Sequence, residues 1–156
     1  MSLEKAKAHL DNFGFADRIQ EFTVSSATVA LAAEALGTEE ARIAKSLSFL
    51  TPEGPILIIA AGDAKVSNSK FKEYFHTKAK MIPHDEVEPL IGHAVGGVCP
   101  FGVNEGVKVY LDESLFRFDM VYPAAGTAAS AVRLTPEELE RASLSIARID
   151  VTTVSQ

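Results

Sequence analysis

Residues 43–60 read IAKSLSFLTPEGPILIIA. Aliphatic and aromatic residues fill both ends of this stretch, and Thr51-Pro52-Glu53-Gly54 in the middle contains both of the strongest turn formers. The pattern predicts two strands, residues 43–50 and 55–60, joined by a tight connection. They should pair antiparallel and form a β-hairpin.

Helical patterns flank this hairpin. Apolar residues at helical spacing predict a first helix that stops at Gly14. Thr28 and Gly37 bracket an alanine-rich helix over residues 29–36, and its lack of a polar face is typical of a buried helix that a sheet wraps around. Near the C-terminus, Thr135-Pro136-Glu137-Glu138 combines an N-cap, a first-turn proline and a capping glutamate, which predicts a further helix start.

The remaining elements are shorter. We expect helices at 67–75 and 84–91, strands at 19–24, 80–82, 107–111 and 145–149, extended segments at 120–123 and 131–134, and a frayed tail at 151–156. This irregular order predicts an α+β fold. It should be a single compact domain over residues 1–156, with a mixed, largely antiparallel sheet wrapped around a buried helix.

Composition limits the possible functions. A chain of 156 residues with 47% hydrophobic content is one domain with a sizeable core. No apolar run approaches the length of a membrane span, and the N-terminus lacks the order of a signal peptide, so a cytoplasmic protein is expected. Cys99 is the only cysteine and the histidines show no close ligand spacing, so no metal or other cofactor is expected.

The net charge is −6, yet the basic residues are unevenly distributed. Five lysines interrupted by one acidic residue occur at Lys65, Lys70, Lys72, Lys78 and Lys80. A local basic face on an acidic body suits contact with the end of an RNA. A solvated helix face explains the same charges equally well.

The segment Gly96-Gly97-Val98-Cys99-Pro100-Phe101-Gly102 is the most informative for chemistry. Paired glycines allow backbone N–H groups to approach a ligand without a Cβ in the way, and Pro100 fixes the exit of the turn. The segment is interpreted as a cradle for a carbonyl or an anion. The alternative is an ordinary tight turn.

Lys45 interrupts an otherwise apolar strand pattern. An ammonium among apolar neighbours is costly unless a phosphate or a developing oxyanion offsets its burial. The alternative is a strand-end lysine whose ammonium reaches solvent. Cys99 with His93 as its base is a second candidate pair, but a catalytic cysteine also needs an electropositive setting, which the sequence does not indicate.

Several stretches together resemble one family. They are Ser25-Ser26-Ala27-Thr28, Ala44-Lys45-Ser46-Leu47, Ala61-Gly62-Asp63, the segment from Gly96 to Gly102, and Gly126 through Leu134-Thr135-Pro136-Glu137-Glu138-Leu139. With these motifs in this order, the chain resembles a free-standing member of the YbaK/prolyl-tRNA-synthetase-associated aminoacyl-tRNA editing domains. The resemblance covers nearly the whole chain and implies the fold of those domains.

The resemblance also implies roles for individual residues. Lys45 would be functional, N–H groups near Gly97 and Val98 would hold an ester carbonyl, and Cys99 would line the pocket rather than attack. The other residues implied to bind the amino acid and the terminal adenosine are Thr28, Gly62, Gly96, Pro100, Phe101, Gly126, Thr127 and Ser130. Two departures weaken assignment to a branch of the family: Thr127-Ala128-Ala129-Ser130 stands where many relatives carry a basic residue, and no histidine follows His93.

The resulting hypothesis is a trans-acting aminoacyl-tRNA deacylase. Its substrate would be a mischarged tRNA, with tRNA-Pro carrying a small amino acid as the expected species and prolyl-tRNA synthetase as a candidate partner. The substrate itself would assist catalysis. The alternative is a non-catalytic module that binds the tRNA acceptor end or a synthetase. Neither hypothesis involves a membrane or a metal.

Overall fold

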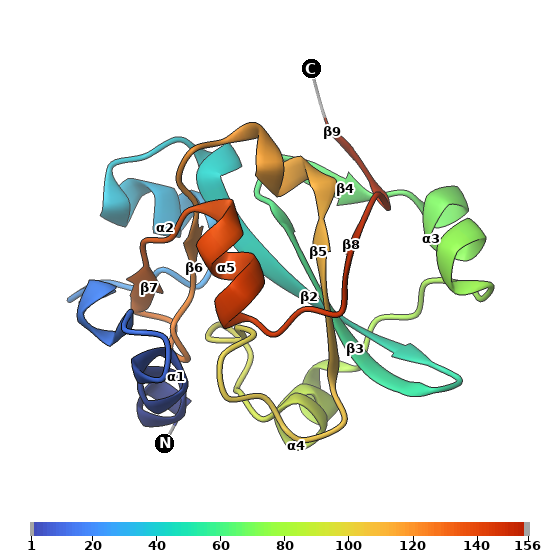
Figure 1. The fold of residues 1–156 in the computed structure, drawn as a ribbon, viewed down its shortest axis with the longest axis horizontal. Helices are drawn as coiled ribbons and strands as arrows, with labels where there is room; N and C mark the ends of the chain where they lie inside the picture. Colours follow the sequence, from blue (N-terminus) through green and yellow to red (C-terminus); the bar gives the residue numbers. More distant parts are fainter. Residues whose placement is uncertain (1, 155–156) are drawn as a thin grey trace.

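The central hairpin is present as the sequence predicts. In the computed structural model, which describes residues 2–154, β2 (Ile43–Thr51) and β3 (Gly54–Ala61) pair antiparallel through a full register from Ala44 opposite Ala61 to Thr51 opposite Gly54. Figure 1 shows this hairpin crossing the centre of the molecule. Its residues 57–61 are fully buried, which explains their unbroken apolar sequence.

A five-stranded sheet forms around the hairpin in the order β6-β2-β3-β5-β8. The added strands are β5 (Lys108–Asp112), β6 (Tyr122–Pro123) and β8 (Ala147–Ile149), and all three run parallel to their neighbours. Two smaller antiparallel ladders join β1 (Ile19–Glu21) to β7 (Ser130–Val132) and β4 (Ala64–Val66) to β9 (Thr152–Val154). The α+β class with a mixed sheet is confirmed. The expected antiparallel majority is wrong for the central sheet, because β5, β6 and β8 each follow a crossover rather than a hairpin turn.

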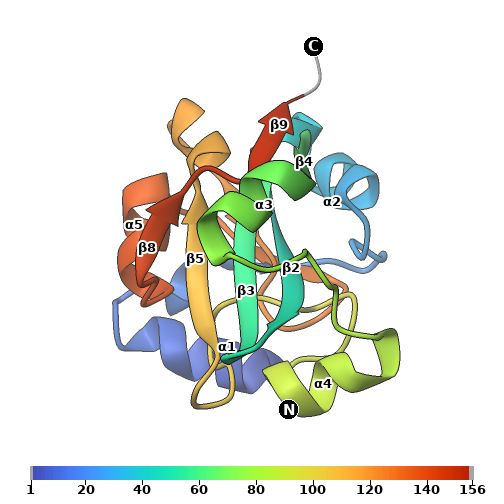
Figure 2. The ribbon, with the colours of Figure 1, turned by 90° about the vertical axis from the view of Figure 1, so that its right-hand side faces the viewer.

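Two faces of the sheet carry different helices. On one face, α1 (Ser2–Asp11) and α5 (Pro136–Ala142) contribute Ala6, Leu10 and Leu139 to the main hydrophobic core. On the other, α3 (Asn68–Phe75) places Phe71 against Phe49 of β2 (Figure 2). Within residues 2–154, four 3-10 turns connect these elements: Ala16–Arg18, Glu40–Arg42, His84–Glu86 and Glu113–Arg117.

The alanine-rich helix α2 (Val29–Leu36) is where predicted, with Thr28 as N-cap and Gly37 in the left-handed conformation at its end. It is not the buried centre of the sheet, however. Only Ala32 and Ala33 are buried, Leu31 is 42% exposed, and the helix lies beyond the β2 edge (Figure 2). The prediction of a buried helix is wrong because small alanines make a helix apolar all round without giving it enough surface to require a surrounding core.

The C-terminal tail is also ordered where it was expected to fray. Val151 is fully buried, and β9 pairs with β4 over Thr152–Val154. The buried Asp112 carboxylate accepts hydrogen bonds from the Val151 N–H at 2.9 Å and the Thr152 hydroxyl at 2.7 Å. These long-range partners, which no local pattern reveals, hold the tail against the sheet. Residues 155–156 lie outside the described part of the chain.

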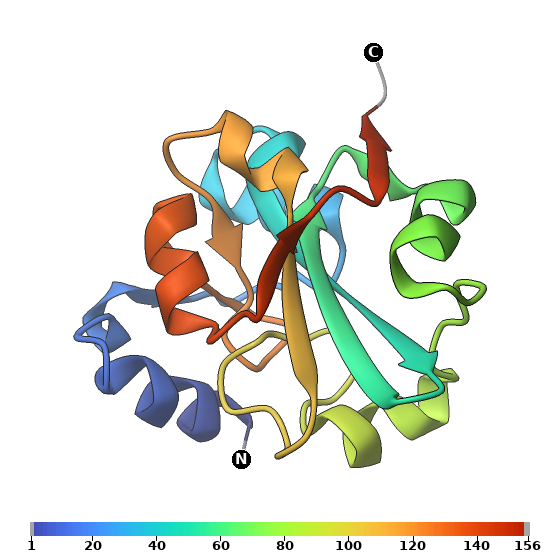
Figure 3. The same ribbon diagram turned by 45° about the vertical axis from the view of Figure 1, so that its right-hand side comes forward.

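The segment after α3 differs from the sequence prediction as well. Residues 80–82 form only a single bridge, Met81 opposite Phe49, with hydrogen bonds from Leu50 N–H to the Lys80 carbonyl and from Ile82 N–H to the Ser48 carbonyl. The expected helix at 84–91 is a 3-10 turn followed by α4 (Val87–Ile91). Figure 3 shows α3 and α4 on either side of the hairpin's turn.

Candidate active site

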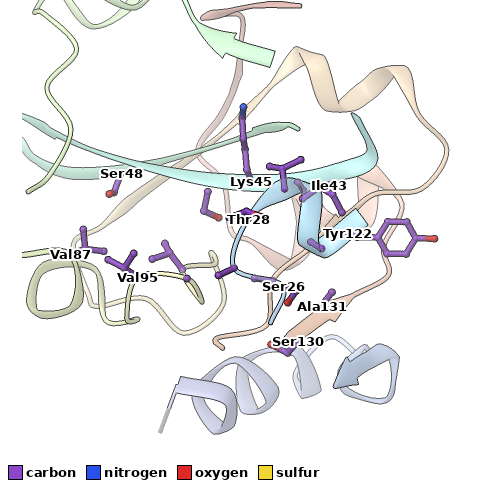
Figure 4. Close-up of a pocket in the computed structure, with 18 of the residues that line it drawn as sticks. Ser26, Thr28, Ile43, Lys45, Ser48, Val87, Val95, Tyr122, Ser130 and Ala131 are labelled. Carbon is purple, nitrogen blue, oxygen red and sulfur yellow. The ribbon is translucent and has the colours of Figure 1, made fainter. Parts of the chain in front are cut away.

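A cavity of about 390 Å³ opens at the outer edge of β2, between α2 and the segment around Met81. Its walls come from six parts of the chain: the 26–32 segment, β2, the 81–87 segment, the glycine loop, β6 and the start of β7. Figure 4 shows ten of the lining residues labelled. The lining residues are Ser26, Ala27, Thr28, Val29, Ala32, Ile43, Ala44, Lys45, Ser46, Ser48, Met81, Ile82, His84, Val87, Val95, Gly96, Val98, Tyr122, Ala124, Ser130 and Ala131.

Most of this lining is apolar, with a few hydroxyl groups placed by local structure. Thr28 lies at the cavity because it caps α2, accepting a hydrogen bond from the Leu31 N–H at 3.1 Å. Ser130 is held by Thr127, whose hydroxyl donates to it at 2.9 Å. Apolar walls with few polar groups are the usual composition of a small-molecule pocket.

The glycine loop forms one wall. Gly96 and Val98 line the cavity, whereas Gly97 faces the other way and packs against the backbone of Gly126 and Thr127. A Cβ on Gly97 would lie 2.5 Å from the Gly126 carbonyl oxygen, so no other residue fits without moving the loop. The Gly97 N–H donates to the Ala94 carbonyl at 3.0 Å, while the Val98 N–H has no partner among the described residues.

Lys45 is half-buried on the opposite face of β2 from Ser46 and Ser48, which follows from the alternation of side chains along a strand. Its ammonium donates to the Gly62 carbonyl at 3.4 Å and to the Ala64 carbonyl. Burial lowers the pKa of this ammonium, and the neighbouring Asp63 opposes that shift. In Figure 4 the side chain rises from β2 away from Ser26 and Ser130, so the charge lies at the rim of the cavity rather than at its base.

The turn that holds Lys45 is itself fixed. Gly62 packs so closely on the 3-10 turn before β2 that a Cβ would overlap the Glu40 carbonyl oxygen. Asp63 pairs with the Arg117 guanidinium through two contacts of 2.6 and 3.1 Å. That hydrogen-bonded pairing lowers the pKa of Asp63, so the carboxylate stays ionised beside Lys45 at neutral pH.

Cys99 does not reach the cavity. It is fully buried with its sulfur 3.5 Å from the His93 Nε2, and burial raises the pKa of the thiol to about 12. Burial also lowers the pKa of His93, whose Nε2 contacts the Phe101 carbonyl at 2.6 Å. A neutral thiol beside a neutral imidazole inside the core is a packing arrangement, because nucleophilic cysteines need a thiolate and access to substrate.

The structure brings together only part of the set predicted from sequence. Thr28, Lys45, Gly96, Val98 and Ser130 line the cavity. Others support it from behind: the Gly62 carbonyl holds Lys45, and Gly97, Gly126 and Thr127 pack on one another. Cys99, Pro100 and Phe101 are buried and are absent from the lining.

Sequence reasoning missed several lining residues: Ser26, Ser46, Ser48, Met81, His84, Val95 and Tyr122. Ser46 and Ser48 left a signal, since two polar residues at a spacing of two in an apolar strand indicate a face that does not pack into the core. Met81 and Val95, which are 58% and 47% exposed, could not be found from the sequence, because isolated apolar residues in loops show no hydrophobic periodicity.

The lysines of the predicted basic face lie in different surroundings. Lys70 is already engaged, since its ammonium lies 3.1 Å from Asp150 and donates to the Thr152 carbonyl at 2.8 Å. Lys72 and Lys78 are exposed and border a shallow hollow beside α3. Lys65 is exposed on β4, next to the Ala64 carbonyl that holds Lys45. Whether these lysines bind tRNA stays a prediction.

Two features are absent from residues 2–154. No described cluster of three His, Cys, Asp or Glu side chains could hold a metal ion. No described helix is long and apolar enough to cross a membrane.

The same fold occurs in proteins linked to tRNA editing. A crystal structure described as that of a candidate trans-editing enzyme for prolyl tRNA synthetase matches with a TM-score of 0.87 and 31% identity over 97% of both chains. The structure of the hypothetical protein APE2540 matches with a TM-score of 0.85 and 26% identity, over 96% of this chain and 99% of that one.

The family model for the aminoacyl-tRNA editing domain matches residues 23–142. This chain belongs to the aminoacyl-tRNA editing domain family, which confirms the resemblance drawn from its sequence. It is 49% identical over 153 residues to the uncharacterized protein YwhH of Bacillus subtilis (strain 168), covering 97% of both chains. It is also 28% identical over 100 residues to the proline--tRNA ligase of Levilactobacillus brevis, where the match covers 64% of this chain and 17% of the ligase.

Proposed function

We propose that this protein is a trans-acting deacylase that hydrolyses the ester of a mischarged tRNA, with tRNA-Pro carrying a small amino acid as its substrate. The observation that carries the proposal is the cavity at the β2 edge, bounded by the glycine loop on one side and by the Lys45 rim on the other. Family membership and the prolyl relatives support the choice of tRNA.

In the proposed reaction the ester carbonyl of the aminoacyl group lies against the glycine loop. The Val98 N–H, which has no partner within the described residues, donates to the carbonyl oxygen as negative charge develops on it. A preorganised donor of this kind is typically worth about 10²–10³ in rate. Of the two N–H groups named from the sequence, those of Gly97 and Val98, this assignment keeps only that of Val98, because the Gly97 N–H already donates to the Ala94 carbonyl.

Water supplies the nucleophile. Its oxygen bonds to the carbonyl carbon, the bond to the ribose oxygen breaks, and that oxygen takes a proton, which leaves a free amino acid and a tRNA with a free terminal hydroxyl. No carboxylate lines the cavity among the described residues. A ribose hydroxyl of the substrate therefore serves as the proton relay, and His84→Gln tests this assignment by removing the histidine among the described lining residues.

Lys45 anchors the phosphate of the terminal nucleotide in this proposal. Its ammonium lies at the rim, held by two backbone carbonyls and beside Lys65, rather than among the residues at the base of the cavity. That position favours the phosphate over direct polarisation of the carbonyl. Amino-acid choice then rests on the fit of the apolar walls, which discriminates by only about 1–3 kcal/mol per methylene.

The test is release of labelled amino acid from a panel of mischarged tRNAs, with correctly charged Pro-tRNA as the reference. We expect release from tRNA-Pro carrying a small amino acid and much slower release from Pro-tRNA. Tight binding of the same tRNAs without any release would support the second candidate, a non-catalytic module for the acceptor end. Neither binding nor release would overturn both.

A further inference from the structure

The outer edge of β2 is paired at its two ends and unpaired between them. At one end Ile43 and Ala44 pair with β6. At the other, the Leu50 N–H donates to the Lys80 carbonyl at 2.8 Å and the Ser48 carbonyl accepts from the Ile82 N–H at 3.1 Å. The cavity lies at the interval between these contacts, since residues from both flanking segments line it.

The direction of the backbone groups in this interval follows from those contacts. The N–H and C=O of one strand residue point to the same side, and the side alternates from residue to residue. Because Leu50 and Ser48 use their outward groups, Ser46 also directs its N–H and C=O outward, and Ser48 its N–H. The pairing with β6 ends at Ala44, and no hydrogen bond to any of these three groups is found among residues 2–154.

The shape of the surrounding site indicates which ligand group could pair with these open N–H and C=O groups. The open interval runs only from Lys45 to the N–H of Ser48, and it is closed at both ends by β6 and by the bridge at Met81. An extended peptide needs room to run along a strand edge, and this interval does not provide it. A compact planar group with a donor next to an acceptor fits, with apolar side chains such as Val29 and Val95 beside it.

Ser46 gives a second sign of an unsatisfied site. Its hydroxyl oxygen is buried without a hydrogen-bond partner, on a residue that lines the cavity. Buried polar atoms are nearly always paired, so an unpaired one at a cavity wall needs an explanation. Together with the open backbone groups, it marks this part of β2 as a surface that a polar ligand completes.

We infer that the open edge of β2 at Ser46 binds the adenine base of the terminal nucleotide. The Ser46 N–H donates to a ring nitrogen of adenine and the Ser46 C=O accepts from its exocyclic amino group. This inference rests on the proposed function, because it takes the ligand to be the end of a tRNA, which is an adenosine. Beyond the proposed function, the inference assigns recognition of the base to the main chain of Ser46 and not to a side chain.

The experiment uses a stable ligand, so that binding is measured without turnover. The probe is 3′-alanylamino-3′-deoxyadenosine, whose amide replaces the ester, and its matched control is the purine analogue that lacks the exocyclic amino group. We expect the amide resonances of Ser46 and Ser48 to shift on titration with the adenosine compound. Loss of the amino group should weaken binding roughly tenfold, as for one lost hydrogen bond.

A pair of variants separates main chain from side chain. Ser46→Pro removes the outward N–H, and since that group does not pair with β3, the hairpin ladder is retained. It should weaken binding of the adenosine compound and of the purine analogue alike, because both lose the contact to the ring nitrogen while the Ser46 C=O that accepts from the amino group is retained. Ser46→Ala should bind both compounds as the unchanged protein does. The ligand series with the unchanged protein decides the question even if Ser46→Pro fails to fold.

Three results would overturn the inference. They are equal affinity for the two analogues, ligand binding without any shift at Ser46 and Ser48, and shifts at these amides with an extended peptide but not with the adenosine compound. A protein that binds the adenosine compound as expected yet releases no amino acid from mischarged tRNA would disprove the proposed activity and leave the base contact standing.

Discussion

One face of β2 is covered by packed side chains, whereas its outer edge borders a cavity. On the face that carries α3, aromatic rings close the surface: the ring centroids of Phe49 and Phe71 are 5.0 Å apart, and those of Phe71 and Phe75 are 4.6 Å apart. We call this cluster of Phe49, Phe71, Phe75 and Tyr110 the aromatic face. At the outer edge, the same strand borders a cavity whose rim residues Met81 and Val95 remain exposed.

This difference separates stability from function within one strand. Side chains of the aromatic face are surrounded and contribute to the free energy of unfolding. At the cavity edge the Ser46 hydroxyl has no partner among the described residues and Met81 and Val95 are exposed, so these groups contribute little to folding and are available to a ligand. Substitutions in the aromatic face should therefore lower the free energy of unfolding and leave deacylation intact, whereas substitutions at the cavity edge should do the reverse. The following predictions test this from the largest effect to the smallest.

Lys45→Ala should reduce deacylation by about 100-fold or more, because the proposed function places this half-buried ammonium on the phosphate of the substrate. Its burial lowers its pKa, a sign that the charge gains little from folding, so the thermal midpoint should move by no more than a few degrees. The control is Lys108→Ala, which removes an exposed lysine 3.9 Å from Glu53. Full activity in Lys45→Ala would remove this residue from the mechanism.

Phe71→Ala should lower stability and leave activity unchanged, the reverse of Lys45→Ala. Removing a fully buried ring from the aromatic face should lower the free energy of unfolding by about 3–5 kcal/mol. Urea unfolding measures the loss, and kcat/KM below the transition should stay near that of the unchanged protein. A large loss of kcat/KM in the folded variant would mean that the two sides of β2 are coupled.

Gly97→Ala should damage both properties, because a Cβ there meets the backbone of Gly126 and Thr127 rather than a flexible side chain. The matched control is Gly106→Ala, at a glycine with φ +92° and open space around it. Both variants should lose stability, but only Gly97→Ala should also lose deacylation at a temperature where it is folded. Equal deacylation by the two variants would show that the glycine loop takes no part in catalysis.

Replacing Lys72 and Lys78 with Glu should weaken tRNA binding by removing phosphate contacts at the hollow beside α3. If each lysine makes one contact, each should reduce the slope of log K against log salt by about 0.7 to 0.9. Hydrolysis of a minimal aminoacyl-adenosine should be unaffected, because the cavity is untouched. An unchanged salt slope would place the tRNA on another face.

Cys99→Ser should have the smallest effect on activity. Since burial raises the thiol pKa to about 12, the thiol stays protonated at neutral pH, and we expect at most a few-fold change in kcat/KM. Alkylation of the folded protein should be slow at pH 7–9 and should accelerate on unfolding. An acyl group trapped on Cys99 would make the protein a cysteine hydrolase and reverse this assignment.

Local patterns in the sequence proved reliable where a few neighbouring residues control the structure. The β2–β3 hairpin follows from its turn residues, and the caps Thr28 and Thr135 begin their helices as predicted. The family could also be identified, because it depends on short motifs in a fixed order. For the site, the sequence pointed to Lys45, to the glycine loop and to Thr28 and Ser130, which do lie at one cavity.

By itself, then, the sequence determined the central hairpin, the capped helices, the α+β class and the family. Only the tertiary structure decided that β5, β6 and β8 run parallel to their neighbours, that Asp112 holds the C-terminal strand, that Cys99 lies in the core, and that Ser46 stands at an open edge. The physical reason is one of range. Caps, turns and periodicity depend on residues a few positions apart, whereas burial and unpaired edges depend on contacts between segments far apart in the chain, and no local pattern encodes them.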